Sequence, residues 1–421
     1  MENQKKIFRS PFFTFSLMSD FKNIRIETYS YDLPDEKIAK FPLKKRDDSK
    51  LLLYKRGEIS ETVFNRISEE IPNDGLLVFN NTKVIQARLL FYKETGAKIE
   101  LFCLEPLDPS EYESAFRQTE RCVWLCLIGN MKKWKEGDLR KNIIIKNRSV
   151  CLKASLKEKT GAGFSIEFSW DNPDFSFAEM LEAAGELPIP PYLNRKTEVS
   201  DNETYQTVYS KIKGSVAAPT AGLHFSKEVF DRLSEKNIQC EELTLHVGAG
   251  TFRPVKSELI IDHEMHGELF FVKKQTVEKL LHRSGKIIAV GTTTVRTLES
   301  LYSIGEILEN NPKPASLNVT QWMPYESPTG ISTEKALQNI LHYLDKNRSE
   351  QLIASTRIMI VPGYKFKIID GIITNFHQPQ STLLLLVSAF LNGNWKSVYD
   401  YALSHDFRFL SYGDGSLLWR E

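Results

Sequence analysis

Two histidines follow turns that could direct them at a substrate. His224 ends a turn in the string AAPTAGLHF (residues 217–225), where a proline and a glycine restrain the backbone. His377 belongs to TNFHQPQSTLL (residues 374–384), a loop between a strand-like run and an apolar helical run. An imidazole can donate or accept a proton near neutral pH, so we predict acid or base roles for both; for His224, the alternative is a hydrogen-bonded structural histidine. Asp414, in the turn FLSYGD, is a lesser candidate.

A different segment is suited to holding an anion. GTTTVRTLES (residues 291–300) follows the apolar run KIIAV, which predicts a strand, a glycine and then a helix. Free amides and hydroxyls at the start of a helix bind carboxylates and phosphates, and an arginine in the first turn opposes the helix dipole unless it grips such a group. Either this segment holds an anion or its threonines only cap the helix. The residues predicted to contact the anion are Thr292, Thr293, Thr294 and Arg296.

The string LHVGAGTFRP (residues 245–254) predicts a loop that faces a ligand. Gly248 and Gly250 would let the backbone approach a ligand closely, and Arg253 adds a cation. The loop resembles the glycine-rich loops of dinucleotide-binding and methyltransferase folds only superficially, because no helical pattern follows at once and an Arg-Pro pair interrupts it. We therefore predict an irregular ligand-facing loop and not a Rossmann site.

The runs between these segments indicate the elements that position them. From about residue 88 to residue 170, six short strand-like runs are separated by glycine-containing or polar turns, with no helical pattern between them. This texture is typical of a small all-β barrel. From about residue 175 onward, helical and strand-like runs alternate, which is typical of α/β folds. In such folds, polar loops at the strand ends form the ligand crevice.

We therefore predict the α/β fold class: a mixed-sheet α/β body with an inserted small all-β barrel domain. The body comprises residues 23–86 and 180–421, and the inserted β-barrel domain comprises residues 87–179. Residues 1–22 have no continuous apolar run and no clear cleavage site, so we expect a flexible extension and not a secretory signal.

The composition is that of a globular protein, and it limits the partners. The chain has 421 residues, 41% of them hydrophobic, and a net charge of only +1. A basic surface for nucleic acid must therefore be local, for example at Lys132, Lys133, Lys135, Arg140 and Lys141, unless these form a solvated edge. Five irregularly spaced cysteines predict no disulfide framework and no metal site. No apolar run reaches the ~20 residues of a spanning helix, so we expect a cytoplasmic protein without membrane association.

Taken together, these segments resemble the family of S-adenosylmethionine:tRNA ribosyltransferase-isomerases. The resemblance runs from YSYDLPDEKIAKFP, which begins at Tyr29, to the C-terminus. It includes LLVFNNTKVIQARL, PIPPYLNR, YQTVY and PGYKF as well as the strings described above, in the order in which the family has them. The family has an α/β body with an inserted β-barrel, so the resemblance implies the same architecture as the texture of the chain.

The resemblance also implies a reaction. The ribosyl group of S-adenosylmethionine is transferred to 7-aminomethyl-7-deazaguanine at the wobble position of tRNA and isomerised, giving epoxyqueuosine and releasing adenine and methionine. S-adenosylmethionine is the co-substrate, tRNA the partner, and no metal and no obligate protein partner are implied. On this basis His224, His377 and Asp414 would move protons, Thr292, Thr293, Thr294 and Arg296 would clamp the methionine carboxylate, and Gly248, Gly250 and Arg253 would line the S-adenosylmethionine site.

The chain departs from the family pattern at several positions. It has Asn81 and Lys83 where the family has aspartate and arginine, and Gln378 and Gln380 where the family has leucine and lysine. Between residues 304 and 357 it carries a charged, partly helical segment that the family pattern does not predict. Two alternatives follow: an enzyme of the same fold acting on another deazapurine or RNA acceptor, or a tRNA-binding protein without catalysis.

Overall fold

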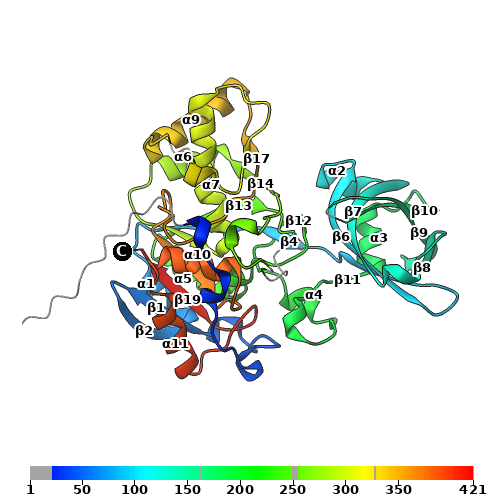
Figure 1. The fold of residues 1–421 in the computed structure, drawn as a ribbon, viewed down its shortest axis with the longest axis horizontal. Coiled ribbons are helices and arrows are strands. Elements are labelled where there is room, and N and C mark those ends of the chain that lie inside the picture. Colours follow the sequence, from blue (N-terminus) through cyan, green and yellow to red (C-terminus); the bar gives the residue numbers. More distant parts are fainter. Residues whose placement is uncertain (1–20, 162, 249–254, 256, 327–328, 421) are drawn as a thin grey trace, which may run out of the picture.

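The structure is a computed structural model that describes residues 21–161, 163–248, 255, 257–326 and 329–420. Two sheets organise this part of the chain, a large one in the α/β body and a curled one beside it (Figure 1). Residues 1–20 of the predicted extension lie outside the described residues, whereas Phe21 and Lys22 belong to a short 3-10 helix. The assignment of the chain to separate domains stays a prediction.

The body is built on a ten-stranded mixed sheet. Its central strands β13, β3, β15 and β18 run parallel to one another, and antiparallel strands extend it on both sides. Strands β3 and β15 are buried along their whole length, as expected for parallel strands covered on both faces. In spatial order the strands are β16 (Asn318–Val319), β17 (Gln351–Thr356), β14 (Glu268–Lys273), β13 (Gln239–Leu245), β3 (Leu76–Asn80), β15 (Ile287–Val290), β18 (Gly371–Asn375), β19 (Gly415–Trp419), β1 (Lys50–Lys55) and β2 (Glu58–Val63).

The second sheet has seven strands, all antiparallel, and it curls around helix α3 (Figure 1). Among the described residues its two end strands are not paired with each other, so the sheet is a half-barrel. The α/β class is thus confirmed, whereas a closed barrel is not. The strands are β11 (Gly185–Glu186), β5 (Arg88–Tyr92), β6 (Lys98–Asp108), β7 (Arg121–Gly129), β10 (Phe164–Trp170), β9 (Arg148–Lys159) and β8 (Leu139–Ile145).

Two short connections join the sheets. Strands β4 (Thr82–Val84) and β12 (Ile212–Ser215) pair in parallel between the body and the curled sheet (Figure 1). A side-chain contact reinforces this junction, because the ring of Tyr112 stacks on the ring of His246 with centroids 4.3 Å apart. His246, at the start of the glycine loop, is therefore buried at the junction with the curled sheet.

Helices cover the large sheet and fill the space inside the curled one. The longest, α7, is buried over most of its length, and Gly305 lets α9 approach it closely, since a Cβ at Gly305 would lie 2.5 Å from Ala336. The segment that the family pattern did not predict thus supplies a packing helix, α9. The helices are α1 (Ile67–Glu70), α2 (Tyr112–Arg117), α3 (Phe177–Ala184), α4 (Asp201–Thr204), α5 (Lys227–Glu235), α6 (Lys274–Leu281), α7 (Thr292–Asn310), α8 (Met323–Glu326), α9 (Thr333–Lys346), α10 (Thr382–Phe390) and α11 (Trp395–Ser404).

Two further expectations concern cysteines and membranes. The five cysteines are all free, and Cys103, Cys122 and Cys126 are buried. None of the helices in the described ranges is long and apolar enough to cross a bilayer.

Candidate active site

A cavity opens where the neighbouring parallel strands β15 and β18 end. The cavity is lined by five short stretches of chain and three single residues. The loops after β15 and β18 meet there because the carboxyl ends of parallel strands share one edge of the sheet. We call this the strand-end cavity. Its lining residues include Tyr192, Tyr205, residues 217–221, Val247, residues 291–293, residues 374–379, residues 381–383, Leu410 and Ser411. The lining carries hydroxyls, the two side-chain amides of Asn375 and Gln378, and one imidazole, and no carboxylate or cationic side chain among the described residues.

His377 is the imidazole of this cavity. Its ring lies within hydrogen-bonding distance of Thr374, with 2.9 Å between Nε2 and Oγ1, and no partner for Nδ1 is found in the described part of the chain. The backbone is held on both sides, because its amide donates to Tyr399 and its carbonyl accepts from Tyr31. Burial lowers the pKa of His377 to about 3, so the ring is neutral at pH 7. The residue is thus a fixed, neutral imidazole with one nitrogen available to a ligand.

The environment of His224 agrees with the alternative, a hydrogen-bonded structural histidine. It is buried behind the strand-end cavity, where Nδ1 contacts the Ser49 hydroxyl at 2.9 Å and Nε2 contacts the Asn375 amide at 3.1 Å. The Asn375 carbonyl oxygen accepts from Thr220, which fixes the orientation of the amide. Both ring nitrogens are therefore occupied. His224 orients Asn375, which lines the cavity, and does not face the cavity itself.

The start of α7 contributes two of the predicted anion-binding threonines. Thr292 and Thr293 line the strand-end cavity, whereas Thr294 is fully buried and donates to the Val290 carbonyl at 2.7 Å. The capping alternative is wrong, because the residue before the helix is Gly291, with φ +87°, and no side chain caps the helix. The first amides of α7 are thus left for another acceptor. The Thr293 hydroxyl is buried and also lacks a partner among the described residues.

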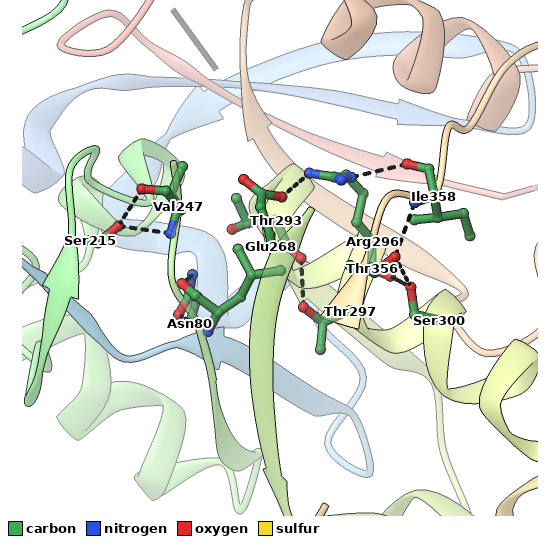
Figure 2. Close-up of polar contacts among 11 residues, drawn as sticks. Asn80, Ser215, Val247, Glu268, Thr293, Arg296, Thr297, Ser300, Thr356 and Ile358 are labelled. Carbon is green, nitrogen blue, oxygen red and sulfur yellow. Dashed lines mark hydrogen bonds and ion pairs between the residues drawn. The ribbon is translucent and has the colours of Figure 1, made fainter. Parts of the chain in front are cut away.

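Arg296 lies deeper than a ligand clamp should. Figure 2 shows its guanidinium directed toward Glu268 and Ile358. Nη1 pairs with the Glu268 carboxylate, and Nε donates to the Ile358 carbonyl at 3.2 Å. The residue is buried and is not part of the cavity lining. The sequence predicts an external anion that offsets the arginine in the first turn, but Glu268 on β14 supplies that anion from within the protein.

Asp414 is likewise engaged. Its carboxylate accepts from the backbone amides of Lys50 and Arg408, at 3.0 and 2.7 Å, and from the Arg408 guanidinium at 2.9 Å. It is buried and does not line the strand-end cavity. These bonds tie the turn before β19 to the start of β1. The geometry therefore gives Asp414 a structural role, beside the site and not in it.

The glycine loop is only partly described. Gly250 and Arg253 lie outside the described residues, so their predicted contacts with S-adenosylmethionine stay predictions. Gly248 is described and follows Val247, which lines the cavity. No group of three or more potential metal ligands is found in the described ranges.

No role was predicted from the sequence for three polar residues of the cavity. Tyr192 and Ser411 share a hydrogen bond of 2.6 Å, and Asn375 mediates between His224 and the cavity. Asn375 stands two residues before His377, and Tyr192 lies in PIPPYLNR, so both were in segments already recognised. What was missing was pairing information, because Tyr192 and Ser411 are 219 positions apart.

The buried histidines predict that the protein loses stability in mild acid. Burial lowers the pKa of His224 and of His246 to about 4, and that of His377 to about 3, whereas unfolded histidine titrates near 6.5. Below about pH 6.5 the unfolded chain therefore binds protons that the folded chain does not. The free energy of unfolding should be constant above that pH and fall by several kcal/mol as the pH approaches about 4. Urea unfolding at a series of pH values measures this.

A matched variant separates the histidines from the carboxylates. His246→Phe removes one of the three histidines, keeps a ring against Tyr112 and removes a buried Nδ1 that lacks a partner among the described residues. The slope of stability against pH should be shallower in this variant than in the wild type. Equal slopes would mean that His246 is not held neutral in the folded protein.

Comparisons with known proteins identify the family of this chain. A family model described as queuosine biosynthesis protein matches residues 26–418. Relatives from Trichlorobacter lovleyi and Halothermothrix orenii, both named S-adenosylmethionine:tRNA ribosyltransferase-isomerase, are each 38% identical to this chain. The first aligns over 400 residues (93% of this chain, 99% of the relative) and the second over 403 residues (94% and 100%).

A solved structure is also similar. It is the crystal structure of an S-adenosylmethionine tRNA ribosyltransferase from Thermotoga maritima, which is 28% identical, has a TM-score of 0.44, and covers 93% of this chain and 99% of its own. The family model spans both the body and the curled sheet and includes every described segment that lines the strand-end cavity. This chain therefore belongs to the family of queuosine biosynthesis proteins.

Proposed function

We propose that this protein is an S-adenosylmethionine-dependent tRNA ribosyltransferase-isomerase. It transfers the ribosyl group to 7-aminomethyl-7-deazaguanine at the wobble position of tRNA and isomerises it to epoxyqueuosine, with release of adenine and methionine. The observation that carries the proposal is the strand-end cavity within a chain of this family. It combines an uncapped helix start, which suits a carboxylate, with a neutral imidazole, which suits proton abstraction.

The carboxylate of S-adenosylmethionine fits the start of α7. The free amides there and the unpartnered Thr293 hydroxyl can donate hydrogen bonds to an anion. The positive end of the dipole of this 19-residue helix also favours a negative charge. The start of α10 lines the same cavity through Thr382 and Leu383. We therefore assign the carboxylate clamp to Thr292, Thr293 and the α7 amides, and no longer to the Arg296 guanidinium.

His377 is the proposed general base. A sulfonium makes the neighbouring C5′ hydrogens acidic, and His377 would take one of these protons on Nδ1 as the sugar expels adenine. The amine of the acceptor base then bonds to C1′ in place of adenine and loses a proton, while adenine leaves with a proton. The C5′ carbon, which kept the electron pair of its lost proton, bonds to C1′ as the C1′–O4′ bond breaks. O4′ then closes on C5′ as the C5′–sulfur bond breaks, which forms the epoxide and releases methionine. Thr374, bonded to Nε2, would hold the ring in orientation throughout. Asn375, fixed by His224 and Thr220, is an amide donor or acceptor for the substrate at the same edge.

Product analysis tests the proposed function. Incubation with S-adenosylmethionine and tRNA bearing the aminomethyl base should release adenine and methionine in equal amounts, measured by chromatography, with the modified nucleoside detected by mass spectrometry. S-adenosylhomocysteine should not form. Its appearance as the stoichiometric product would identify a methyltransferase and overturn the proposal.

The acceptor distinguishes the alternatives. Gln378 lines the strand-end cavity, where the family has leucine, so one polar side chain differs at the substrate. An enzyme for another deazapurine or RNA would release adenine with that acceptor and not with the aminomethyl tRNA. A binding protein without catalysis would release none with either.

A further inference from the structure

A second cavity adjoins the strand-end cavity, and the function proposed above does not use it. We call it the arginine cavity. The two share Ser411, and His224 forms part of the wall of the arginine cavity while its Nε2 contacts Asn375 of the other. The lining residues of the arginine cavity are Pro42, Leu43, Arg46, Ser49, Thr204, Leu223, His224, Arg408, Ser411, Tyr412 and Gly413.

The lining of the arginine cavity is suited to an anion. It contains two guanidinium groups, from Arg46 and Arg408, and four hydroxyls, but no carboxylate among its lining residues. Asp47, next to Arg46, accepts a hydrogen bond from Ser226 at 2.8 Å and is not part of the lining. The cavity therefore differs from the strand-end cavity, whose described lining has no charged side chain.

Arg46 is the less engaged of the two arginines. Arg408 is bonded to Asp414, whereas the side chain of Arg46 makes a single hydrogen bond in the described ranges, from Nη1 to the Gln206 carbonyl at 3.0 Å. No ion pair to Arg46 is found there. Its half-buried position lowers its pKa, which is the sign of a cation not fully compensated by the protein. Its other guanidinium donors remain for a ligand.

The stretch of chain before Arg46 carries two further cations and two exposed apolar side chains, and Asp47 and Asp48 follow it. Lys44 and Lys45 precede Arg46 and are exposed. Phe41 and Leu43, on the same stretch, are 49% and 36% exposed. Cations with interspersed aromatic and apolar side chains are typical of surfaces that track a single-stranded nucleic acid backbone. A single-stranded nucleic acid that enters the arginine cavity would contact these residues.

We propose that the arginine cavity binds a backbone phosphate of the acceptor RNA through Arg46 while the target base occupies the strand-end cavity. This inference rests on the proposed function, which makes RNA the substrate. A phosphate and a base of one strand are covalently linked, so two adjoining cavities that share Ser411 can receive both at once. The inference assigns the RNA approach to the body, at residues 41–46, and not to the basic cluster on the curled sheet.

The test compares two variants with equal loss of charge. The first is Lys44→Gln/Lys45→Gln/Arg46→Gln at the arginine cavity, and the second is Lys132→Gln/Lys133→Gln/Lys135→Gln on the curled sheet. Affinity for the tRNA substrate is measured for the full-length proteins over a range of salt concentrations. The first variant should bind roughly tenfold or more weakly, and its slope of log affinity against log salt should be shallower by about 0.7–0.9 for each phosphate that it no longer binds. The second variant should match the wild type.

Two further measurements keep the outcomes distinct. Arg46→Gln alone should reduce the slope while melting temperature and S-adenosylmethionine affinity stay at wild-type values, which excludes a folding defect. Inorganic phosphate is added as a separate probe at constant ionic strength. If it binds the wild type at the arginine cavity and RNA affinity is unchanged by Arg46→Gln, the cavity belongs to a free anion and the inference is wrong.

The remaining outcomes separate this inference from the proposed function. A wild-type slope in the first variant together with a reduced slope in the second would overturn the inference and move the RNA to the curled sheet. A wild type that binds tRNA through Arg46 but releases no adenine would overturn the proposed function and leave the inference standing. A wild type that does not bind tRNA at any salt concentration would overturn both.

Discussion

Replacing His377 with alanine should slow the release of adenine by ~10²–10⁴-fold, the usual contribution of a general base. The reason is geometric, since His377 is the imidazole that lines the strand-end cavity and its Nδ1 has no partner among the described residues. Single-turnover release of adenine in the presence of the acceptor tRNA measures the chemical step. Affinity for S-adenosylmethionine, measured by calorimetry, should change little, because the carboxylate clamp lies on α7.

Two control variants make this result specific. His246→Phe also removes a buried histidine, but at the junction with the curled sheet, so its rate should equal that of the wild type. His224→Ala should slow the reaction less than His377→Ala, because His224 acts through Asn375. An undiminished rate in a folded His377→Ala protein would contradict the assignment and pass the base role to another cavity group, with Tyr192 the first to test.

The pH dependence of the His377 step has a defined sign. Burial lowers the pKa of this residue to about 3, so the basic, neutral form is already present throughout the neutral range. The rate constant at low substrate should therefore not fall between about pH 7 and pH 5 through protonation of His377 in the free enzyme. A fall with an apparent pKa near 6.5 that disappears in His377→Ala would show that the ring titrates normally.

Removing the Arg296 side chain should destabilise the protein by about 3–5 kcal/mol, because it leaves the Glu268 carboxylate buried without its counter-charge. Both side chains are almost completely buried, at 9% and 6% exposure, and the guanidinium also bonds the Ile358 carbonyl (Figure 2). Urea unfolding of Arg296→Ala at neutral pH measures the loss. Arg25→Ala is a suitable comparison, because Arg25 pairs with Glu258 on the exposed surface, where such a pair contributes little.

A double variant distinguishes a structural pair from a ligand clamp. Replacing both partners, as in Glu268→Met/Arg296→Met, removes the buried charges together and should recover most of the stability. If Arg296 is structural, this protein binds S-adenosylmethionine as the wild type does. A loss of affinity of about 1.5–3 kcal/mol in the folded double variant would instead return the carboxylate clamp to Arg296.

Much of the architecture could be predicted because it depends on local patterns. Buried parallel strands such as β15 are continuous apolar runs, and the exposed and buried sides of the curled sheet alternate along its strands, so both are visible in the sequence. The loops at the ends of β15 and β18 were recognised for the same reason, and the structure brings them to one cavity. His377, Thr292 and Thr293 line that cavity, and their roles stay predictions.

The partners of the charged and titratable side chains could not be predicted, because they come from distant parts of the chain. Arg296 alone indicated an external anion, but Glu268 on β14 meets it only after the sheet has formed. The sequence left open whether His224 is a base or a hydrogen-bonded structural histidine, and Ser49 and Asn375, at 175 and 151 positions away, occupy both its nitrogens. Residue types and spacing determined which loops carry the chemistry. The tertiary structure decided which groups remain available, since a buried polar group must find a partner wherever the fold supplies one.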